Sequence, residues 1–208
     1  MDALFEKLHQ QINQGITTQN TYLITGLGNP GREYRLTRHN VGFMAIDALV
    51  KEWSLTTQKI QSKAIITTGN IKGNKVILAK PQTYMNLSGQ AVSGLMNFYK
   101  ISLDHLLVIH DDIDLPFGTI RIRPGGGSAG QKGVGSIIER LGTQEFARMR
   151  LGVGRPPGQM ESADYVLQSF SKEDEEFLKG FLLKAGEAAE EFIIQGLNAA
   201  MNKFNGSF

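Results

Sequence analysis

Hydrophobic and polar positions along this chain alternate between the spacing of strands and the spacing of helices. Short apolar runs predict buried strands at Tyr22–Thr25, Ala64–Thr68, Lys75–Ala79, Leu106–Ile109, Thr119–Arg123 and Arg148–Val153. Apolar residues at helical spacing predict helices over Val41–Trp53, Ser88–Tyr99, Val134–Leu141 and a long final segment that a capping box at Ser171 and Asp174 begins. This order indicates a single α/β domain, a sandwich in which a twisted, mainly parallel mixed sheet is flanked by helices.

The first 20 residues stand apart from this pattern. They lack arginine and a continuous apolar core, so they resemble neither a signal peptide nor an organellar presequence. Phe5, Leu8 and Ile12 could form one face of a short helix. We therefore divide the chain into an N-terminal extension of unassigned role, residues 1–20, and one domain, residues 21–208.

Composition narrows the functional class. No apolar run approaches the length of a membrane span, and the absence of cysteine excludes disulfides and thiolate metal sites, which fits a cytoplasmic protein. Although the net charge is only +2, basic residues gather in two glycine-rich regions and acidic residues gather in the final helix. The basic set is Arg32, Arg35, Arg38, Arg121, Arg123, Lys132, Arg140, Arg148, Arg150 and Arg155. Such a distribution could present a positive face to a polyanion, or the arginines could simply be solvent-exposed loop residues.

A polar link from Gly26 to Gly42 joins the first strand to the first helix. Ligands of α/β sheets bind beyond the carboxyl ends of strands, so this link marks a candidate site. Its first six residues also spell G-x-G-x-x-G, but that dinucleotide fingerprint needs a helix that starts within the glycine turn. Pro30-Gly31 instead continues the turn, and Asp47, which is placed for the ribose contact, lies inside a predicted helix. Nucleotide binding is therefore a weak alternative.

Two further polar links, residues 84–86 and 110–114, also follow predicted strands. If those strands are parallel neighbours, a histidine, an aspartate and several asparagines meet His39 at one edge of the sheet. That set suits hydrolysis by water: the histidine takes a proton, the aspartate supports the imidazolium, and amides hold the acyl group. The second link could instead bind a metal through its histidine and aspartates. Taken alone, Tyr84 and Met85 are more typical of core residues.

Four blocks of sequence resemble bacterial peptidyl-tRNA hydrolase, in the order and spacing of that family. They are GLGNPG-x-x-Y…TRHN in residues 26–40, QTYMNLSG in 82–89, HD…DLP in 110–116 and GGGSAG in 125–130. Enzymes of this family cleave the ester between a peptidyl group and the 3′ ribose of tRNA. The resemblance, which runs from about Tyr22 to the C-terminus, implies that reaction in a cytoplasmic monomer, with no cofactor and no metal.

The resemblance also implies roles for individual residues. His39 would be the general base that activates water, and Asp111 would hold His39 in its basic form. Asn29 would help to distinguish N-blocked peptidyl groups from free aminoacyl groups. The implied substrate-binding residues are Tyr34, Tyr84 and Asn86 around the tRNA end and peptide backbone, and Arg123 and Arg150 on tRNA phosphates.

One departure from the family pattern lies after the glycine-rich block. The pattern usually continues with His-Asn-Gly, whereas this chain has Gln131-Lys132-Gly133. An asparagine amide donates and accepts hydrogen bonds, but a lysine ammonium only donates. Lys132 could still bind a phosphate or a carbonyl, so we place it in the substrate site.

A non-catalytic RNA-binding protein is the main alternative, because similar proteins with this fold serve as RNA-splicing partners in plastids. This chain keeps His39, Asp111, Asn29 and Asn86. Contacts to phosphates would not require those residues. The sequence therefore favours the hydrolase.

Overall fold

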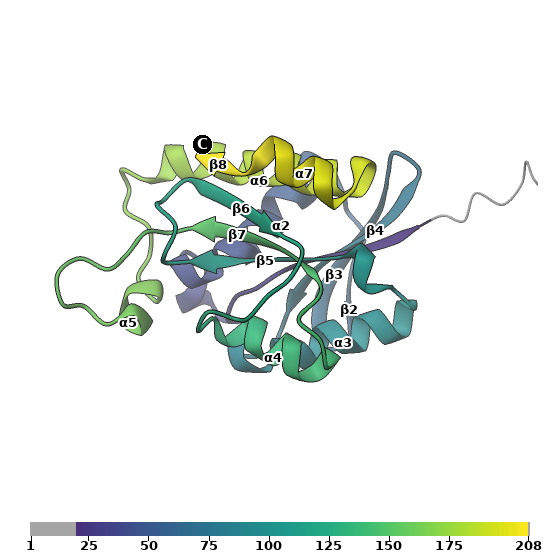
Figure 1. Cartoon of the computed structure of the whole chain (residues 1–208), viewed down its shortest axis with the longest axis horizontal. Helices are drawn as coiled ribbons and strands as arrows, with labels where there is room; N and C mark the ends of the chain where they lie inside the picture. The colour runs from purple at the N-terminus through teal and green to yellow at the C-terminus, as the bar shows by residue number, and fades with distance from the viewer. Residues whose placement is uncertain (1–19, 208) are drawn as a thin grey trace, which may run out of the picture.

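A mixed sheet of eight strands forms the centre of the computed structural model, which describes residues 20–207 (Figure 1). The strand order is β2-β3-β4-β1-β5-β7-β6-β8. The strands are β1 Thr21–Gly26, β2 Gln58–Gln61, β3 Ala64–Ile71, β4 Asn74–Pro81, β5 Leu106–Asp112, β6 Thr119–Arg123, β7 Ala147–Gly152 and β8 Gly206–Ser207. Strands β4, β1, β5 and β7 are parallel, and antiparallel strands extend the sheet at both sides. The predicted α/β class with a mixed sheet is confirmed.

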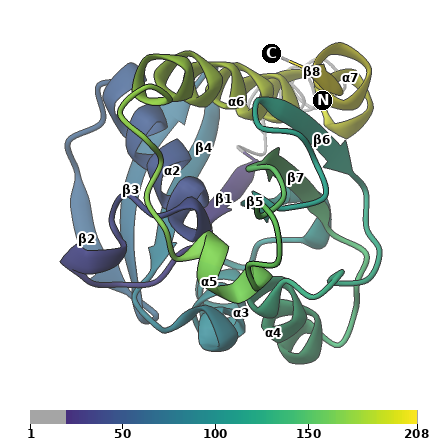
Figure 2. The same ribbon diagram turned by 90° about the vertical axis from the view of Figure 1, so that its left-hand side faces the viewer.

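Helices cover both faces of this sheet (Figures 1 and 2). The helices are α2 Val41–Glu52, α3 Ser88–Tyr99, α4 Lys132–Leu141, α5 Ser162–Val166, α6 Glu175–Gln195 and α7 Leu197–Phe204. Helices α2, α6 and α7 share one apolar core with the sheet, and α3 and α4 share the other. Short α5 lies in front of the edge where the parallel strands end (Figure 2).

The central strands are buried on both faces, which explains why their sequences are continuous apolar runs. In β5, Leu107 and Ile109 point into the core beneath α2, whereas Leu106 and Val108 point into the core beneath α3. All four side chains are fully buried. Burial on both sides fixes the register of the strand and so the position of the polar residues that follow Ile109.

Several boundaries differ from the prediction. β5 continues to Asp112, so His110 and Asp111 lie in the strand rather than in the link after it. Pairing with β7 continues as far as Asp112 and Gly152, and this backbone pairing outweighs the polar sequence. The predicted exchange between Ser171 and Asp174 is present, with both backbone-to-side-chain bonds at 3.2 Å. The sequence patterns did not predict β2, α5, α7 or β8, which are short.

The predicted helix face of Phe5, Leu8 and Ile12 lies outside the described residues. Within residues 20–207, no helix has both the length and the apolar character to cross a membrane.

Candidate active site

A cleft of about 770 Å³ lies at the edge of the sheet where the parallel strands end. Its walls come from the loop after β1, the link after β4, the end of β5 and the glycine-rich loop before α4. Residues of α5 complete one side. The three polar links that the sequence placed at one edge of the sheet therefore do meet.

The loop after β1 is closed at its neck by two glycines. A Cβ on Gly26 would lie 2.0 Å from the carbonyl oxygen of Gly42, and a Cβ on Gly42 would lie 2.5 Å from that of Ile109. Only glycine allows the end of β1, the start of α2 and β5 to approach so closely. The loop thus folds back over β5. Because α2 begins only at Val41, beyond the glycine turn, the structure lacks the helix start that dinucleotide binding requires.

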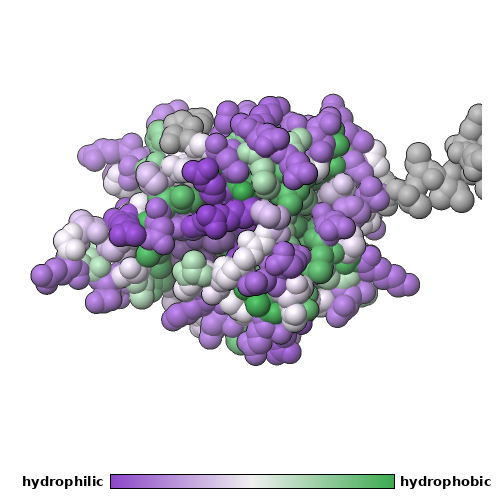
Figure 3. All heavy atoms as spheres, in the orientation of Figure 1, coloured by the Kyte–Doolittle hydropathy of each residue, from purple (hydrophilic) through white to green (hydrophobic). Residues whose placement is uncertain are grey.

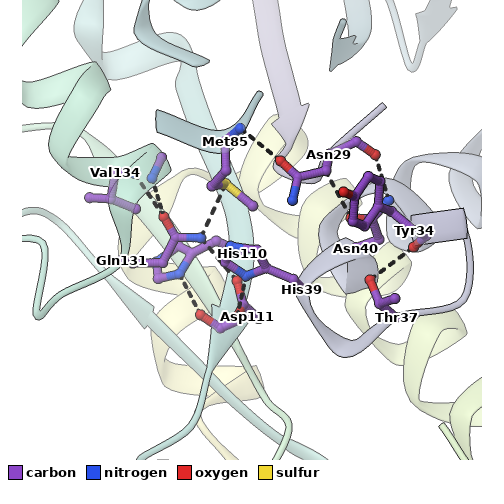
Figure 4. Close-up of polar contacts among 11 residues, drawn as sticks. Asn29, Tyr34, Thr37, His39, Asn40, Met85, His110, Asp111, Gln131 and Val134 are labelled. Carbon is purple, nitrogen blue, oxygen red and sulfur yellow. Dashed lines mark hydrogen bonds and ion pairs between the residues drawn. The ribbon is translucent and has the colours of Figure 1, made fainter. Parts of the chain in front are cut away.

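His39 and Asp111 form a hydrogen-bonded pair in the cleft (Figure 4). His39 belongs to η2 (Arg38–Asn40), and its Nδ1 lies 2.8 Å from Asp111 Oδ2. An ionised carboxylate only accepts hydrogen bonds, so Nδ1–H donates and Nε2 keeps its lone pair. Asp111 is 4% exposed, and 14% of the His39 side chain is exposed. In this tautomer the Nε2 lone pair is free to accept a proton, as a general base requires, and His39 lines the cleft.

The second oxygen of Asp111 is held by a residue to which sequence reasoning gave no role. Gln131 Nε2 donates to Asp111 Oδ1 at 2.9 Å, while Gln131 Oε1 accepts the backbone N–H groups of Gly133 and Val134. Gln131 is thus the N-cap of α4 as well as a partner of the carboxylate. Two signals in the sequence pointed to Gln131, its place just before a predicted helix and its departure from the histidine of the family pattern.

The amide of Asn29 is fixed by contacts on several sides. Its Oδ1 accepts the Met85 N–H at 2.9 Å. Asn40 Oδ1 accepts the Asn29 N–H, and Asn40 Nδ2 donates to the Asn29 carbonyl, both at 2.9 Å. Figure 4 shows the resulting orientation, in which the Asn29 Nδ2 group remains as a donor beside the cleft. Asn40 is buried, and sequence reasoning assigned it no role.

His110 differs from His39 although it also adjoins Asp111. It is buried, its Nδ1–H donates to the Asp111 carbonyl at 2.8 Å, and burial lowers its pKa, so it is neutral at pH 7. Asp112 and Asp114 each pair with an arginine. The side chains of residues 110–114 therefore turn to different partners. Among residues 20–207, no group of three or more His, Cys, Asp or Glu side chains is placed to hold a metal ion.

The predicted substrate-binding residues divide into two groups. Tyr84 and Asn86 line the cleft, and Tyr84 is 63% exposed, so the reading of Tyr84 as a core residue is wrong. Met85 is buried, as expected. Tyr34 ends η1 (Arg32–Tyr34) and is not part of the cleft lining. Its carbonyl instead accepts bonds from the backbone and hydroxyl of Thr37, at 3.0 and 2.8 Å.

Three arginines from β6 and β7 lie on one side of the cleft. Arg123 is exposed, whereas Arg150 donates from Nε to the Asp112 carboxylate. Arg148 is buried and donates to the carbonyls of Gly126 and Gly127, so it supports the glycine-rich loop. Burial lowers the pKa of Arg148, and the nearby charges of Arg150 and Arg123 lower it further. Figure 3 shows strongly hydrophilic side chains gathered over this part of the molecule.

Arg38 is another basic residue with an internal role. Its guanidinium donates to the Ser169 carbonyl at 2.8 Å and lies over the ring of Tyr165, 4.4 Å from the ring centre. The backbone of Thr37 also pairs with that of Ser169. These contacts attach the segment around α5 to the residue next to His39. Arg38 and Arg148 are therefore not free members of the expected basic face.

Lys132 begins α4 at the rim of the cleft, with its side chain exposed. If its ammonium acts on His39 and Asp111, it disfavours the imidazolium. We expect Lys132→Asn to keep or improve ester cleavage and to move the acidic limb of the pH–rate profile to higher pH, because a cation is removed. The profile of Lys72→Asn, in the turn between β3 and β4, is the control. Superimposable acidic limbs would show that Lys132 does not act on the base.

Comparisons with known proteins agree with this geometry. The profile of the family "Peptidyl-tRNA hydrolase" matches residues 23–208. The chain belongs to the peptidyl-tRNA hydrolase family. It is 54% identical over 183 residues to the peptidyl-tRNA hydrolase of Desulforamulus reducens, covering 88% of each chain. It is 49% identical over 185 residues to that of Chloroflexus aggregans, covering 88% of this chain and 98% of the other.

A crystal structure gives the same result in three dimensions. The peptidyl-tRNA hydrolase of Acinetobacter baumannii superimposes with a TM-score of 0.83 at 35% identity, covering 93% of this chain and 98% of that one.

Proposed function

We propose that this protein hydrolyses the ester bond between a peptidyl group and the 3′ ribose of tRNA, releasing free tRNA and peptide. The observation that carries the proposal is the His39–Asp111 pair, 2.8 Å between Nδ1 and Oδ2, at the end of a cleft of about 770 Å³. Family membership supplies the substrate class. Cleavage of peptidyl-tRNA recycles tRNA after aborted translation.

The geometry supports a general-base mechanism. His39 Nε2 takes a proton from water, and the water oxygen attacks the ester carbonyl while the Asp111 carboxylate stabilises the imidazolium. The carbon–oxygen bond to the ribose then breaks, and the His39 proton passes to the leaving 3′ oxygen. The Asn29 amide, which Met85 and Asn40 hold in place, donates to the peptidyl group and helps to select N-blocked substrates.

The size of the cleft limits what it can contain. A volume of about 770 Å³ suits a small ligand, so it fits the terminal nucleotide and the adjoining peptide rather than the body of a tRNA. Tyr84 and Asn86 are the exposed side chains at that place, and Lys132 adjoins them at the rim. The tRNA body then lies along the outer surface, where Arg123 and Arg150 can contact phosphates without reading sequence.

We also propose that the enzyme acts as a cytoplasmic monomer without cofactor or metal. One chain supplies the catalytic pair, the Asn29 support and the basic residues of the cleft. The complete absence of cysteine fits a reducing compartment. The catalytic domain is residues 21–208, and residues 1–20 receive no role.

A turnover assay tests the proposed function. Purified protein is incubated with N-acetyl-aminoacyl-tRNA and, separately, with free aminoacyl-tRNA. We expect catalytic release of the N-acetylated amino acid and much slower cleavage of the unblocked ester. Protein that binds tRNA with no turnover would instead identify a binding module.

Arg123, which is exposed, and Arg150, which is mostly buried, should differ in their effect on tRNA binding. Arg123→Ala is expected to weaken binding and to reduce the log–log salt slope by about 1, with little change in turnover at saturating substrate. Arg150→Ala should change the slope less, because Asp112 already offsets part of its charge. It should also lower the melting temperature, because a buried carboxylate loses its partner.

Binding titrations at several salt concentrations measure this difference. Lys179→Ala, which removes an exposed charge from α6 on another face, is the control and should leave the slope unchanged. An Arg123→Ala slope equal to that of the wild type would show that Arg123 does not touch phosphate.

A further inference from the structure

Gln131 uses every hydrogen-bonding position of its amide. Oε1 accepts from Gly133 N–H at 2.6 Å and from Val134 N–H at 2.9 Å. Nε2 donates to Asp111 Oδ1 at 2.9 Å and to Met85 Sδ at 3.4 Å. Because two backbone donors occupy the oxygen, the NH₂ group must face the carboxylate, and the amide cannot be turned around.

These bonds complete a closed set of contacts around the cleft (Figure 4). Asp111 joins His39 to Gln131, and Gln131 reaches Met85. The Met85 N–H holds Asn29, and Asn29 is bonded on both backbone groups to Asn40, the residue after His39. Movement of any one member therefore disturbs the others.

We propose that Gln131 is a positioning residue that holds the Asp111 carboxylate in the orientation His39 requires. The proposal rests on the hydrolysis proposed above. Asp111 is buried and has two oxygens, one bonded to His39 and the other to Gln131. Without the amide, the carboxylate can rotate about its terminal bond, so the imidazole keeps a charged partner but is no longer held in one orientation.

Gln131 is uncharged, and this property affects the Asp111 carboxylate in addition to the hydrogen bond that Gln131 donates. A histidine, which the family pattern usually has at this position, could become protonated near pH 6.5 and place a second cation on Asp111. Gln131 has no charge at any pH. His110 is kept neutral by burial, which lowers its pKa. Gln131 therefore holds the Asp111 carboxylate without adding a titratable charge beside it.

Two substitutions separate the bond to Asp111 from the cap on α4. Serine is a good N-cap but is too short to reach Asp111, so Gln131→Ser keeps the cap and loses the donor. Histidine caps poorly, yet its Nε2–H matches the reach of the glutamine amide, so Gln131→His keeps the donor and loses the cap. The turnover assay with N-acetyl-aminoacyl-tRNA, run on wild-type protein and on His39→Ala, tests the proposed hydrolysis independently of Gln131.

We expect Gln131→Ser to lower kcat about tenfold or more with KM changed less than about threefold, because the base is misoriented while binding persists. Its acidic limb should move to higher pH, since the carboxylate no longer shares its charge with an N–H donor and favours the imidazolium more strongly. Gln131→His should keep kcat within about threefold at pH 8 and lose activity more steeply below about pH 6.5.

The opposite pattern would overturn the proposal. If Gln131→Ser keeps full kcat and an unmoved acidic limb while Gln131→His is impaired in proportion to a lower melting temperature, the residue only caps α4. A uniform loss of kcat at every pH in both variants would likewise assign Gln131 a purely structural role. Gln58→Ser, on exposed strand β2, is the control for the substitution itself.

Discussion

His39→Ala is expected to lower the rate of peptidyl-tRNA hydrolysis by about 10²- to 10⁴-fold and to leave tRNA affinity almost unchanged. The loss should be large because the Nε2 lone pair of His39 is the base that activates water in the proposed mechanism. Affinity should persist because Arg123 and Arg150, the residues proposed to contact phosphates, lie on other strands. The measurement is single-turnover cleavage of N-acetyl-aminoacyl-tRNA, beside a binding titration.

A second histidine provides the matched control. His105 ends η4 (Leu103–His105), just before β5 begins, and its ring lies 4.4 Å from that of Tyr22. It is therefore at the opposite end of the strand from the cleft, and His105→Ala should keep wild-type turnover. Near-normal turnover by folded His39→Ala protein would remove His39 from the mechanism.

Asp111→Asn is expected to reduce the rate by about 10²-fold or more, with a smaller effect on tRNA binding. Gln131 donates to one oxygen of Asp111, so the carbonyl of a new asparagine should turn toward Gln131 and its NH₂ group toward His39. His39 Nδ1 would then have to accept, and its proton would move to Nε2. The lone pair that activates water is lost in that tautomer.

The pH dependence gives a second readout of the same substitution. The imidazolium loses its adjacent anion, so the acidic limb of the pH–rate profile should move to lower pH. An unchanged profile, or a rate within a few-fold of wild type, would contradict the pairing of Asp111 with His39. Asp104→Asn, in η4 at the far end of β5, is the control for the change from carboxylate to amide.

Strongly patterned elements were predictable from sequence, and the reasons are physical. Helix α2 and strand β1 agree with their predictions within a residue at each end. In each segment the spacing of the buried apolar residues matches only one kind of element. The end of β5 was missed because hydrophobicity stops at Ile109 while pairing with β7 continues to Asp112. β2 was missed because it is an exposed edge strand of polar residues.

In the site, too, the features set by local sequence could be predicted, and the features set by contacts between distant residues could not. The links after β1, β4 and β5 could be placed at one edge because strand order brings parallel ends together. The roles of Gln131, Asn40 and Arg148 could not be predicted, since each depends on a side-chain hydrogen bond to a residue at least 11 positions away in the chain, which no local pattern specifies. Tyr34 matched the motif but is not among the residues that line the cleft.

The contact between Gly26 and Gly42 has a consequence for protein engineering. A loop whose two ends already touch behaves as a module that can be exchanged without moving the strand before it or the helix after it. Asn29 and Asn40 bond to each other just inside that neck, so a transplanted segment would bring its own internal support. A loop grafted here would have to keep Asn29 and His39, because their side chains bond to Met85 and Asp111 outside the loop.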